Sequence, residues 1–147
     1  MSVKIEIIEE TFSIDIYGFG ETAFNKDYSG TAFRLSGKMW ETLKAYALEN
    51  KGKNIWVYDK DDNVFAGVEL TSIPSSIIEL EHRSISLKKY AYYKHIGSYS
   101  LIKQAGHLVR NELKAKGYKT DLPYIEIYGH WTNDETKLET ELFMSLL

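Results

Sequence analysis

The sequence predicts an α+β domain in which a strand–helix–strand–strand unit occurs twice, and three observations lead to this prediction. Two amphipathic segments carry apolar residues at helical spacing, and two segments with strand character follow each of them. The tetrapeptide Ile-Trp-Val-Tyr at 55–58 corresponds to Ile-Glu-Ile-Tyr at 125–128. The length of 147 residues suits a single domain with halves at about 1–71 and 77–147. We therefore expect a pseudo-two-fold repeat that forms one antiparallel sheet with two helices on one face.

Alternating polarity predicts two strands at the beginning of the chain. Residues 3–8 alternate apolar with charged side chains, and residues 12–18 place three apolar side chains on one face. Side chains of a strand point alternately to opposite sides, so each segment should bury one face only. Gly18 and Gly20 interrupt the second pattern, and we expect the strand to end there.

A helix and two further strands complete the first half. Ser36 can accept a hydrogen bond from a free backbone amide, so we expect the helix to begin there and to stop near Gly52. Strands are predicted at 55–58 and 64–70. The charged stretch between these two strands is typical of a hairpin turn.

The same order returns in the second half, after a polar stretch at 72–76 that we interpret as a connector. Residues 86–95 form a long strand region. Ser98 is a candidate N-cap for the second helix, and Gly117 is its expected end. The last two strands are predicted at 124–129 and 138–144.

Composition and charge exclude several classes of function. The chain has no Cys, which removes disulfides, thiolate catalysis and Cys-based metal sites. Its four His show no paired metal spacing, and no phosphate-binding glycine loop or serine-hydrolase elbow occurs, so we expect no cofactor and no metal. A net charge of −3 disfavours direct nucleic-acid binding. No apolar run is long enough for a membrane span and no signal peptide is recognisable, so we expect a soluble cytoplasmic protein.

The most informative stretch for chemistry is Pro-Tyr-Ile-Glu-Ile-Tyr-Gly-His-Trp at 123–131. On a strand, Tyr124, Glu126 and Tyr128 share one face. A buried carboxylate needs a partner, because desolvation favours its neutral form. Tyr hydroxyls can supply hydrogen bonds, and an organic cation can supply the opposite charge. A solvated surface Glu is the alternative interpretation, and the residue pattern alone leaves both open.

At these residues the sequence resembles the GyrI-like domain, the effector-binding domain of AraC-type and multidrug-sensing regulators. The resemblance rests on residues 87–99 with their His-x-Gly-x-Tyr end, on the stretch 123–128 with its Glu-x-Tyr motif, and on the closing segment 139–146 with its Thr-Glu-apolar pattern. In the first half the match is looser, at Trp40 and in Ala-Gly-Val at 66–68. The resemblance implies a pseudo-symmetric pair of units with a ligand groove between them.

The resemblance also implies which residues form the site. In family members that bind cationic lipophilic drugs, the Glu of Glu-x-Tyr contacts the positive charge, and this role falls to Glu126. Tyr128 matches within the same motif. Four further aromatic residues are expected to complete the pocket, from their face or proximity: Trp40, Trp56, Tyr92 and Trp131. Regulators of the family carry a separate DNA-binding region and none precedes the domain here, so we expect a stand-alone module.

The leading hypothesis is a protein that binds a small hydrophobic or cationic ligand and acts as a sensor or a sink. Two alternatives remain: a hydrolase of reactive xenobiotics that uses the same pocket, and a protein-interaction module comparable to a gyrase inhibitor. An apolar sheet face should also need cover from a homodimer or a protein partner. That face consists of Ile55, Val57, Ile125 and Ile127.

Overall fold

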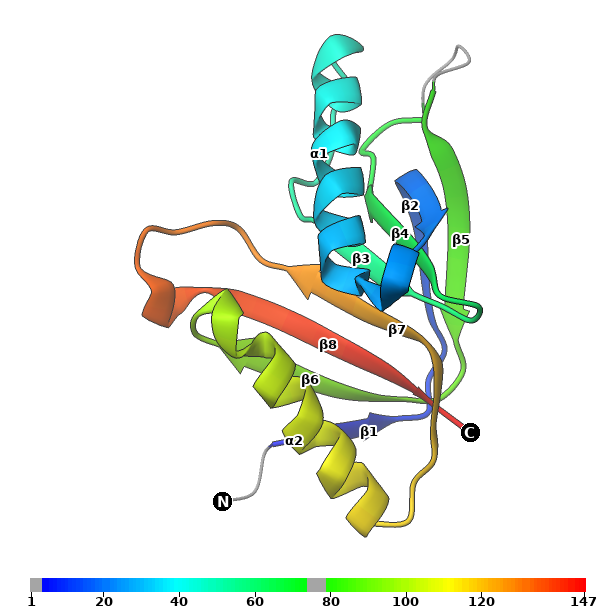
Figure 1. Cartoon of the computed structure of the whole chain (residues 1–147), viewed down its shortest axis with the longest axis vertical. Helices are drawn as coiled ribbons and strands as arrows, with labels where there is room; N and C mark the ends of the chain where they lie inside the picture. The colour runs from blue at the N-terminus through cyan, green and yellow to red at the C-terminus, as the bar shows by residue number, and fades with distance from the viewer. Residues whose placement is uncertain (1–3, 74–78) are drawn as a thin grey trace.

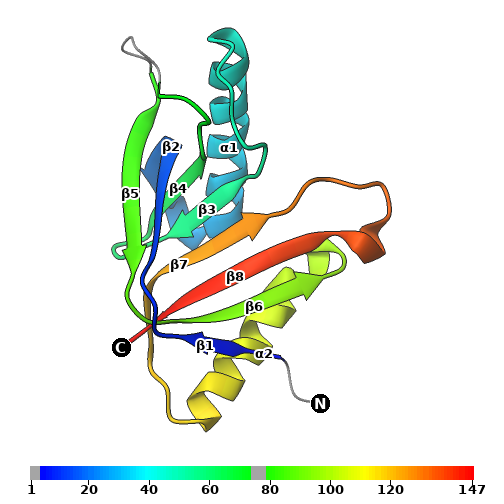
Figure 2. The same ribbon diagram turned by 180° about the vertical axis from the view of Figure 1, so that it is seen from behind.

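The computed structural model describes residues 4–73 and 79–147, and it contains one antiparallel eight-stranded sheet with two helices on one face (Figures 1 and 2). The predicted fold class is therefore confirmed. The helices are α1 (Tyr28–Ala45) and α2 (Ile102–Ala115). The strands are β1 (Glu6–Ile8), β2 (Phe12–Thr22), β3 (Ile55–Tyr58), β4 (Asn63–Val68), β5 (Glu81–Leu87), β6 (Tyr90–Ile96), β7 (Thr120–Tyr128) and β8 (Glu139–Leu146). Part of the predicted connector at 72–76 lies outside the described residues.

The strand order is β1-β6-β8-β7-β3-β4-β2-β5, and the two halves meet where β3 pairs with β7. This pairing places Trp56 directly opposite Glu126. Each half also contributes one strand to the other, because β1 pairs with β6 and β5 pairs with β2. The chain thus passes between the halves at both of these strands, and the sheet is shared.

Helix α1 begins at Tyr28, well before the predicted start at Ser36. Asp27 is the actual N-cap, and its side chain accepts a first-turn amide at 3.1 Å. Ser36 lies inside the helix, where its hydroxyl bonds to Asn54 Oδ1 at 2.8 Å. The prediction of Ser36 as N-cap was wrong because a helix tolerates an internal Ser whose hydroxyl finds a partner elsewhere. The helix also ends earlier than expected, at Ala45.

Strand β2 continues through both of its glycines to Thr22, so the predicted end at Gly18 was wrong. Gly18 pairs with Gly67 of β4. A Cβ at Gly18 would collide with the Ala66 carbonyl oxygen and would lie 2.6 Å from the Gly67 Cα. Glycine here permits a close approach of two strands instead of ending one.

The second half follows the prediction more closely, except that the strand region 86–95 contains a break. β5 ends at Leu87 and β6 begins at Tyr90, and the chain crosses to the other half of the sheet between them. Ser98 caps the short 3₁₀ turn that leads into α2, and its Oγ accepts a backbone amide at 3.3 Å. Gly117 follows the helix with φ of +86°, in the left-handed conformation that a helix end favours.

The helix-free face of the sheet curves onto itself and encloses a core. The four apolar side chains that were expected to need a partner lie in this core, and none is more than 8% exposed. The stacked rings of Phe12 and Phe143, 4.8 Å apart, join strands from opposite parts of the sheet. This face therefore gives no reason to expect a homodimer or a protein partner. The core consists of Ile14, Ile16, Ile55, Val57, Phe65, Leu87, Tyr90, Ile125, Ile127 and Phe143.

The two helices cover different parts of the other face. Helix α1 packs on β2 and β4 through Leu35, Met39 and their neighbours, and α2 packs on β6 and β8 through Val109 and Leu113. Figure 1 shows the two helices apart from each other on the same side of the sheet. Neither of them is long and apolar enough to cross a membrane, and the same holds for every helix in the described part of the chain.

Candidate functional site

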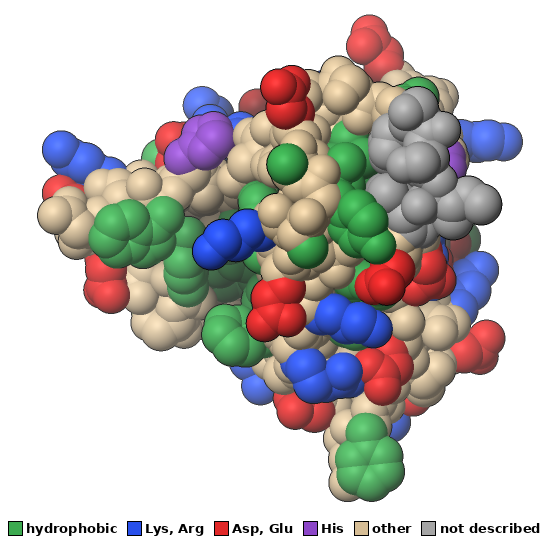
Figure 3. All heavy atoms as spheres, turned by 90° about the horizontal axis from the view of Figure 1, so that it is seen from above, with side chains coloured by type: hydrophobic (Ala, Val, Ile, Leu, Met, Phe, Trp, Pro, Cys, Tyr) green, Lys and Arg blue, Asp and Glu red, His purple; other side chains and the backbone are tan. Residues whose placement is uncertain are grey.

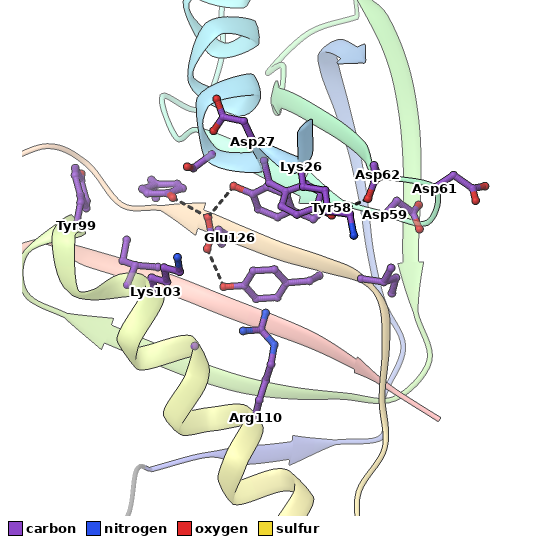
Figure 4. Close-up of a pocket in the computed structure, with 17 residues that line it drawn as sticks. Lys26, Asp27, Tyr58, Asp59, Asp61, Asp62, Tyr99, Lys103, Arg110 and Glu126 are labelled. Carbon is purple, nitrogen blue, oxygen red and sulfur yellow. Dashed lines mark hydrogen bonds between the residues drawn. The ribbon is translucent and has the colours of Figure 1, made fainter. Parts of the chain in front are cut away.

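A pocket of about 700 Å³ lies between the start of α1, the β3–β4 turn and α2, over the seam between β3 and β7 (Figure 4). Its size is within the range of small-molecule sites, about 300–1,000 Å³. Glu126 lies in its wall, and acidic and basic side chains stand around it. The aromatic part of the lining consists of Tyr28, Tyr58, Tyr99, Tyr124 and Tyr128.

Glu126 is buried, with 7% of its surface exposed, and three tyrosine hydroxyls donate to its carboxylate. Tyr124 donates to Oε2 at 2.8 Å, Tyr128 donates to Oε1 at 2.7 Å, and Tyr58 donates to Oε1 at 3.4 Å. Among the residues that the structure describes, no Lys or Arg nitrogen lies within 4.0 Å of these oxygens. Glu126 is therefore a buried carboxylate with hydrogen-bond donors but without an ion-pair partner, and not a solvated surface residue.

Strand geometry explains why these side chains meet. Alternation along β7 places Tyr124, Glu126 and Tyr128 on the helix-covered side of the sheet. Pairing with β3 brings Tyr58 opposite Tyr124, and their rings stack with centroids 5.8 Å apart. The same register places Trp56 against Tyr128, with ring centroids 4.8 Å apart. The register between the two halves thus assembles the cluster.

The three hydroxyls around the carboxylate stay protonated. Burial raises the pKa of Tyr58, Tyr124 and Tyr128, and the negative charge of Glu126 raises each pKa further. A protonated phenol has one hydrogen to donate, and each of these hydroxyls directs it to the carboxylate. The tyrosines can therefore act as donors and as neutral aromatic surfaces at physiological pH, but not as bases.

Charged groups of both signs line the pocket. Asp59, Asp61 and Asp62 lie in the turn between β3 and β4, whereas Lys103 and Arg110 lie on α2. In Figure 4, Arg110 extends from α2 toward the Glu126 cluster. Lys26 and Asp27, which precede α1, also line the pocket, so its basic groups are not confined to α2.

Two of the six predicted site residues line the pocket, namely Glu126 and Tyr128, and a third, Trp56, contacts a lining residue. Trp56 packs behind the ring of Tyr128. Trp40 lies between α1 and the sheet, where its indole N–H donates to Asn54 Oδ1 at 2.6 Å. Neither tryptophan is part of the lining.

The last two predicted residues, Tyr92 and Trp131, lie away from the pocket. Tyr92 points to the opposite side of the sheet, where its hydroxyl donates to Glu141 at 2.6 Å and its ring contacts Phe143. Trp131 follows β7 and is 74% exposed. Both were selected by nearness to a motif, which does not determine on which side of a sheet a side chain lies.

Sequence reasoning missed Tyr58, the third donor to the carboxylate. A signal was present, because Tyr58 and Tyr128 occupy corresponding positions in the two repeated tetrapeptides. Arg110 and Tyr28 were also missed, and no motif marks either of them. They reach the pocket only through the packing of α2 and α1 against the sheet.

The chemical groups that the site presents are a buried carboxylate, hydroxyl donors and aromatic rings. The described residues contain no group of three or more His, Asp or Glu that could hold a metal ion. A carboxylate surrounded by hydroxyl donors and aromatic rings attracts a cation by charge and by cation–π contact.

On the face that Figure 3 shows, Lys and Arg side chains are interspersed with Asp and Glu and form no continuous basic stripe. Such a stripe is the usual mark of a nucleic-acid interface.

No protein-family model matches the chain, and no curated protein matches it. Several solved structures, however, match the chain over nearly its whole length. The C-terminal domain of EcmrR is 16% identical with a TM-score of 0.74, covering 100% of this chain and 99% of that one. EcmrR in complex with DNA also matches with 15% identity and a TM-score of 0.66, covering 97% of this chain and 57% of that one.

Two further solved structures match over nearly the whole chain. SAV2435, which is bound to tetraphenylphosphonium, is 17% identical with a TM-score of 0.63, covering 100% of this chain and 94% of that one. A hydrolase from Listeria innocua is 11% identical with a TM-score of 0.56, covering 99% and 93%. At such low identities the similarity concerns the fold, so the chain has the fold of the EcmrR C-terminal domain and of SAV2435.

Proposed function

We propose that this protein is a GyrI-like ligand-binding domain whose tyrosine-lined pocket binds a small hydrophobic cation, as a sensor or as a sink. The observation that carries the proposal is Glu126, a buried carboxylate with three hydroxyl donors and no cationic side chain within ion-pair distance among the described residues. The fold shared with SAV2435, which is bound to a phosphonium cation, supports the same conclusion.

The energetics of the site favour a cation with apolar groups. Hydroxyl donors stabilise the carboxylate but leave its negative charge in place, so an entering cation gains a direct electrostatic attraction. Each aromatic face that a cation contacts adds about 0.5–2 kcal/mol. The neutral rings of Tyr58 and Tyr128 line the pocket beside the charge, whereas the ring of Tyr124 stacks on Tyr58 and lies under the guanidinium of Arg110.

The same geometry favours binding over hydrolysis by a general base. A carboxylate has about four acceptor positions, and three hydroxyls already donate to that of Glu126. The surrounding tyrosines have raised pKa values and therefore stay protonated, so they cannot act as the base that removes a proton from water.

The proposal is tested by calorimetric titration with tetraphenylphosphonium and a panel of other lipophilic cations. We expect wild type to bind and Glu126→Gln to bind at least about tenfold more weakly, because the amide has the same shape without the charge. Glu141→Gln is a matched control, since this carboxylate also accepts a tyrosine hydroxyl, at 2.6 Å, but on the other side of the sheet. It should bind like wild type. Absence of binding across the panel, or equal binding by wild type and Glu126→Gln, would contradict the proposal.

A further inference from the structure

Helix α2 presents two positive charges to the pocket from one face. Lys103, Gly106 and Arg110 all line the pocket, and their spacing places them along one side of the helix. Gly106 leaves room for the larger of the two cations, because a Cβ there would lie 3.2 Å from Arg110 Nη1. The Arg110 guanidinium can therefore lie close to Gly106 on the side of α2 that lines the pocket.

These two cations have no ion-pair partner in the described part of the chain. Neither Lys103 nor Arg110 has a carboxylate oxygen within 4.0 Å, whereas Lys94 pairs with Glu139 at 3.0 Å elsewhere on the sheet. Arg110 instead holds its guanidinium 5.0 Å from the centre of the Tyr124 ring. Its charge is thus positioned at the pocket without being neutralised there.

Tyr124 connects the two opposite charges of the site. Its hydroxyl donates to Glu126 at 2.8 Å, and the guanidinium of Arg110 lies over its ring, 5.0 Å from the ring centre. The negative and positive groups are close to the same ring but are not themselves in contact. A simple cation in this pocket is attracted by the first group and repelled by the second.

We propose that the ligand this pocket selects is a zwitterion, an aromatic or otherwise hydrophobic cation that also carries a carboxylate. The inference rests on the function proposed above and specifies its ligand class. The cationic end is held by Glu126 and the surrounding rings, while the carboxylate faces α2 and pairs with Arg110, assisted by Lys103. Arginine suits this role because its planar group can bind a carboxylate through two parallel hydrogen bonds.

The test compares two probes that differ by one charge. These are para-carboxybenzyl-triphenylphosphonium, which is a zwitterion at neutral pH, and its methyl ester, which is a simple cation. By calorimetry we expect wild type to bind the zwitterion about tenfold more tightly than the ester, as for one added charged hydrogen bond. In Arg110→Met this preference should disappear. The ester should then bind more tightly than it does to wild type, because a repelling charge has been removed.

Two further variants complete the design. Lys103→Met should reduce the preference for the zwitterion, and Lys114→Met should leave it unchanged, since Lys114 is an exposed residue of α2 outside the pocket lining. If the ester binds to wild type as tightly as the zwitterion does, this inference is overturned while the proposed function stands. If neither probe nor any lipophilic cation binds, both this inference and the proposed function are contradicted. A zwitterion preference that persists in Arg110→Met and in Lys103→Met would also overturn it.

Discussion

Three tyrosine hydroxyls around one carboxylate contribute to the way the stability of the protein depends on alkaline pH. Burial and the charge of Glu126 raise the pKa of Tyr58, Tyr124 and Tyr128 above the ordinary value of 10.0. Below pH 10 both the folded and the unfolded chain keep these protons, so the contribution to stability is constant. Above pH 10 only the unfolded chain releases them, and the free energy of unfolding must fall as pH rises.

We therefore expect urea denaturation at a series of pH values to show a steep loss of stability above pH 10. The limiting contribution is about 1.4 kcal/mol per pH unit for each of the three tyrosines. Tyr124→Phe should make the slope shallower, because it removes one of these groups. Tyr46→Phe, at a tyrosine that is 47% exposed, serves as control and should keep the wild-type slope. An unchanged slope in Tyr124→Phe would contradict the assignment.

The part of the site that lies on one strand was predictable from sequence, and the rest was not. Alternation alone places Tyr124, Glu126 and Tyr128 on one side of β7, as the structure has them. Tyr58 joins them only through the register of β3 against β7, and Arg110 only through the docking of α2. Both relations depend on contacts between distant segments, which a local pattern does not contain.

At the scale of elements, close contact between strands β2 and β4 makes one glycine essential. Gly18→Ala should lower the free energy of unfolding by about 3 kcal/mol, because the new Cβ would collide with the Ala66 carbonyl oxygen. Gly37→Ala is the matched control: Gly37 lies inside α1 and a Cβ there meets nothing within 4 Å. It should raise stability by about 0.5–1 kcal/mol. Urea denaturation measures both, and equal effects of the two substitutions would refute the explanation.

The types of the main elements followed from sequence, but the start of α1 did not. The apolar stripe of this helix includes Ala32 and Leu35 before it reaches Met39 and Leu43, so helical spacing already extended toward the N-terminus. The predicted cap, Ser36, lies inside the helix, whereas the true cap is Asp27. Capping residues are common in turns and helices alike, and the periodicity of the buried face was the better guide.

At the scale of the whole molecule, the exchange of strands β1 and β5 between the halves could not be inferred from the repeat. A duplicated strand–helix–strand–strand pattern is equally compatible with two self-contained units. Pairing of β5 with β2 and of β1 with β6 instead folds the helix-free face onto itself. For this reason the apolar face of Ile55, Val57, Ile125 and Ile127 is covered within the chain.

Strand exchange also predicts that the protein unfolds as one unit. Leu113→Ala tests this, because Leu113 is fully buried under α2 in the second half and its truncation should cost about 2–5 kcal/mol. Trp56 contacts Tyr128 of the second half and Trp131 lies in that half, so the test uses a Trp56→Phe, Trp131→Phe background. In this background tryptophan fluorescence reports on the first half through Trp40, whereas far-UV circular dichroism reports on both halves. We expect the urea midpoints of both signals to shift together, since neither half retains a complete sheet without the other. If the fluorescence midpoint stays at the value of this background while the dichroism transition moves or splits, the halves unfold independently and the shared sheet does not couple them.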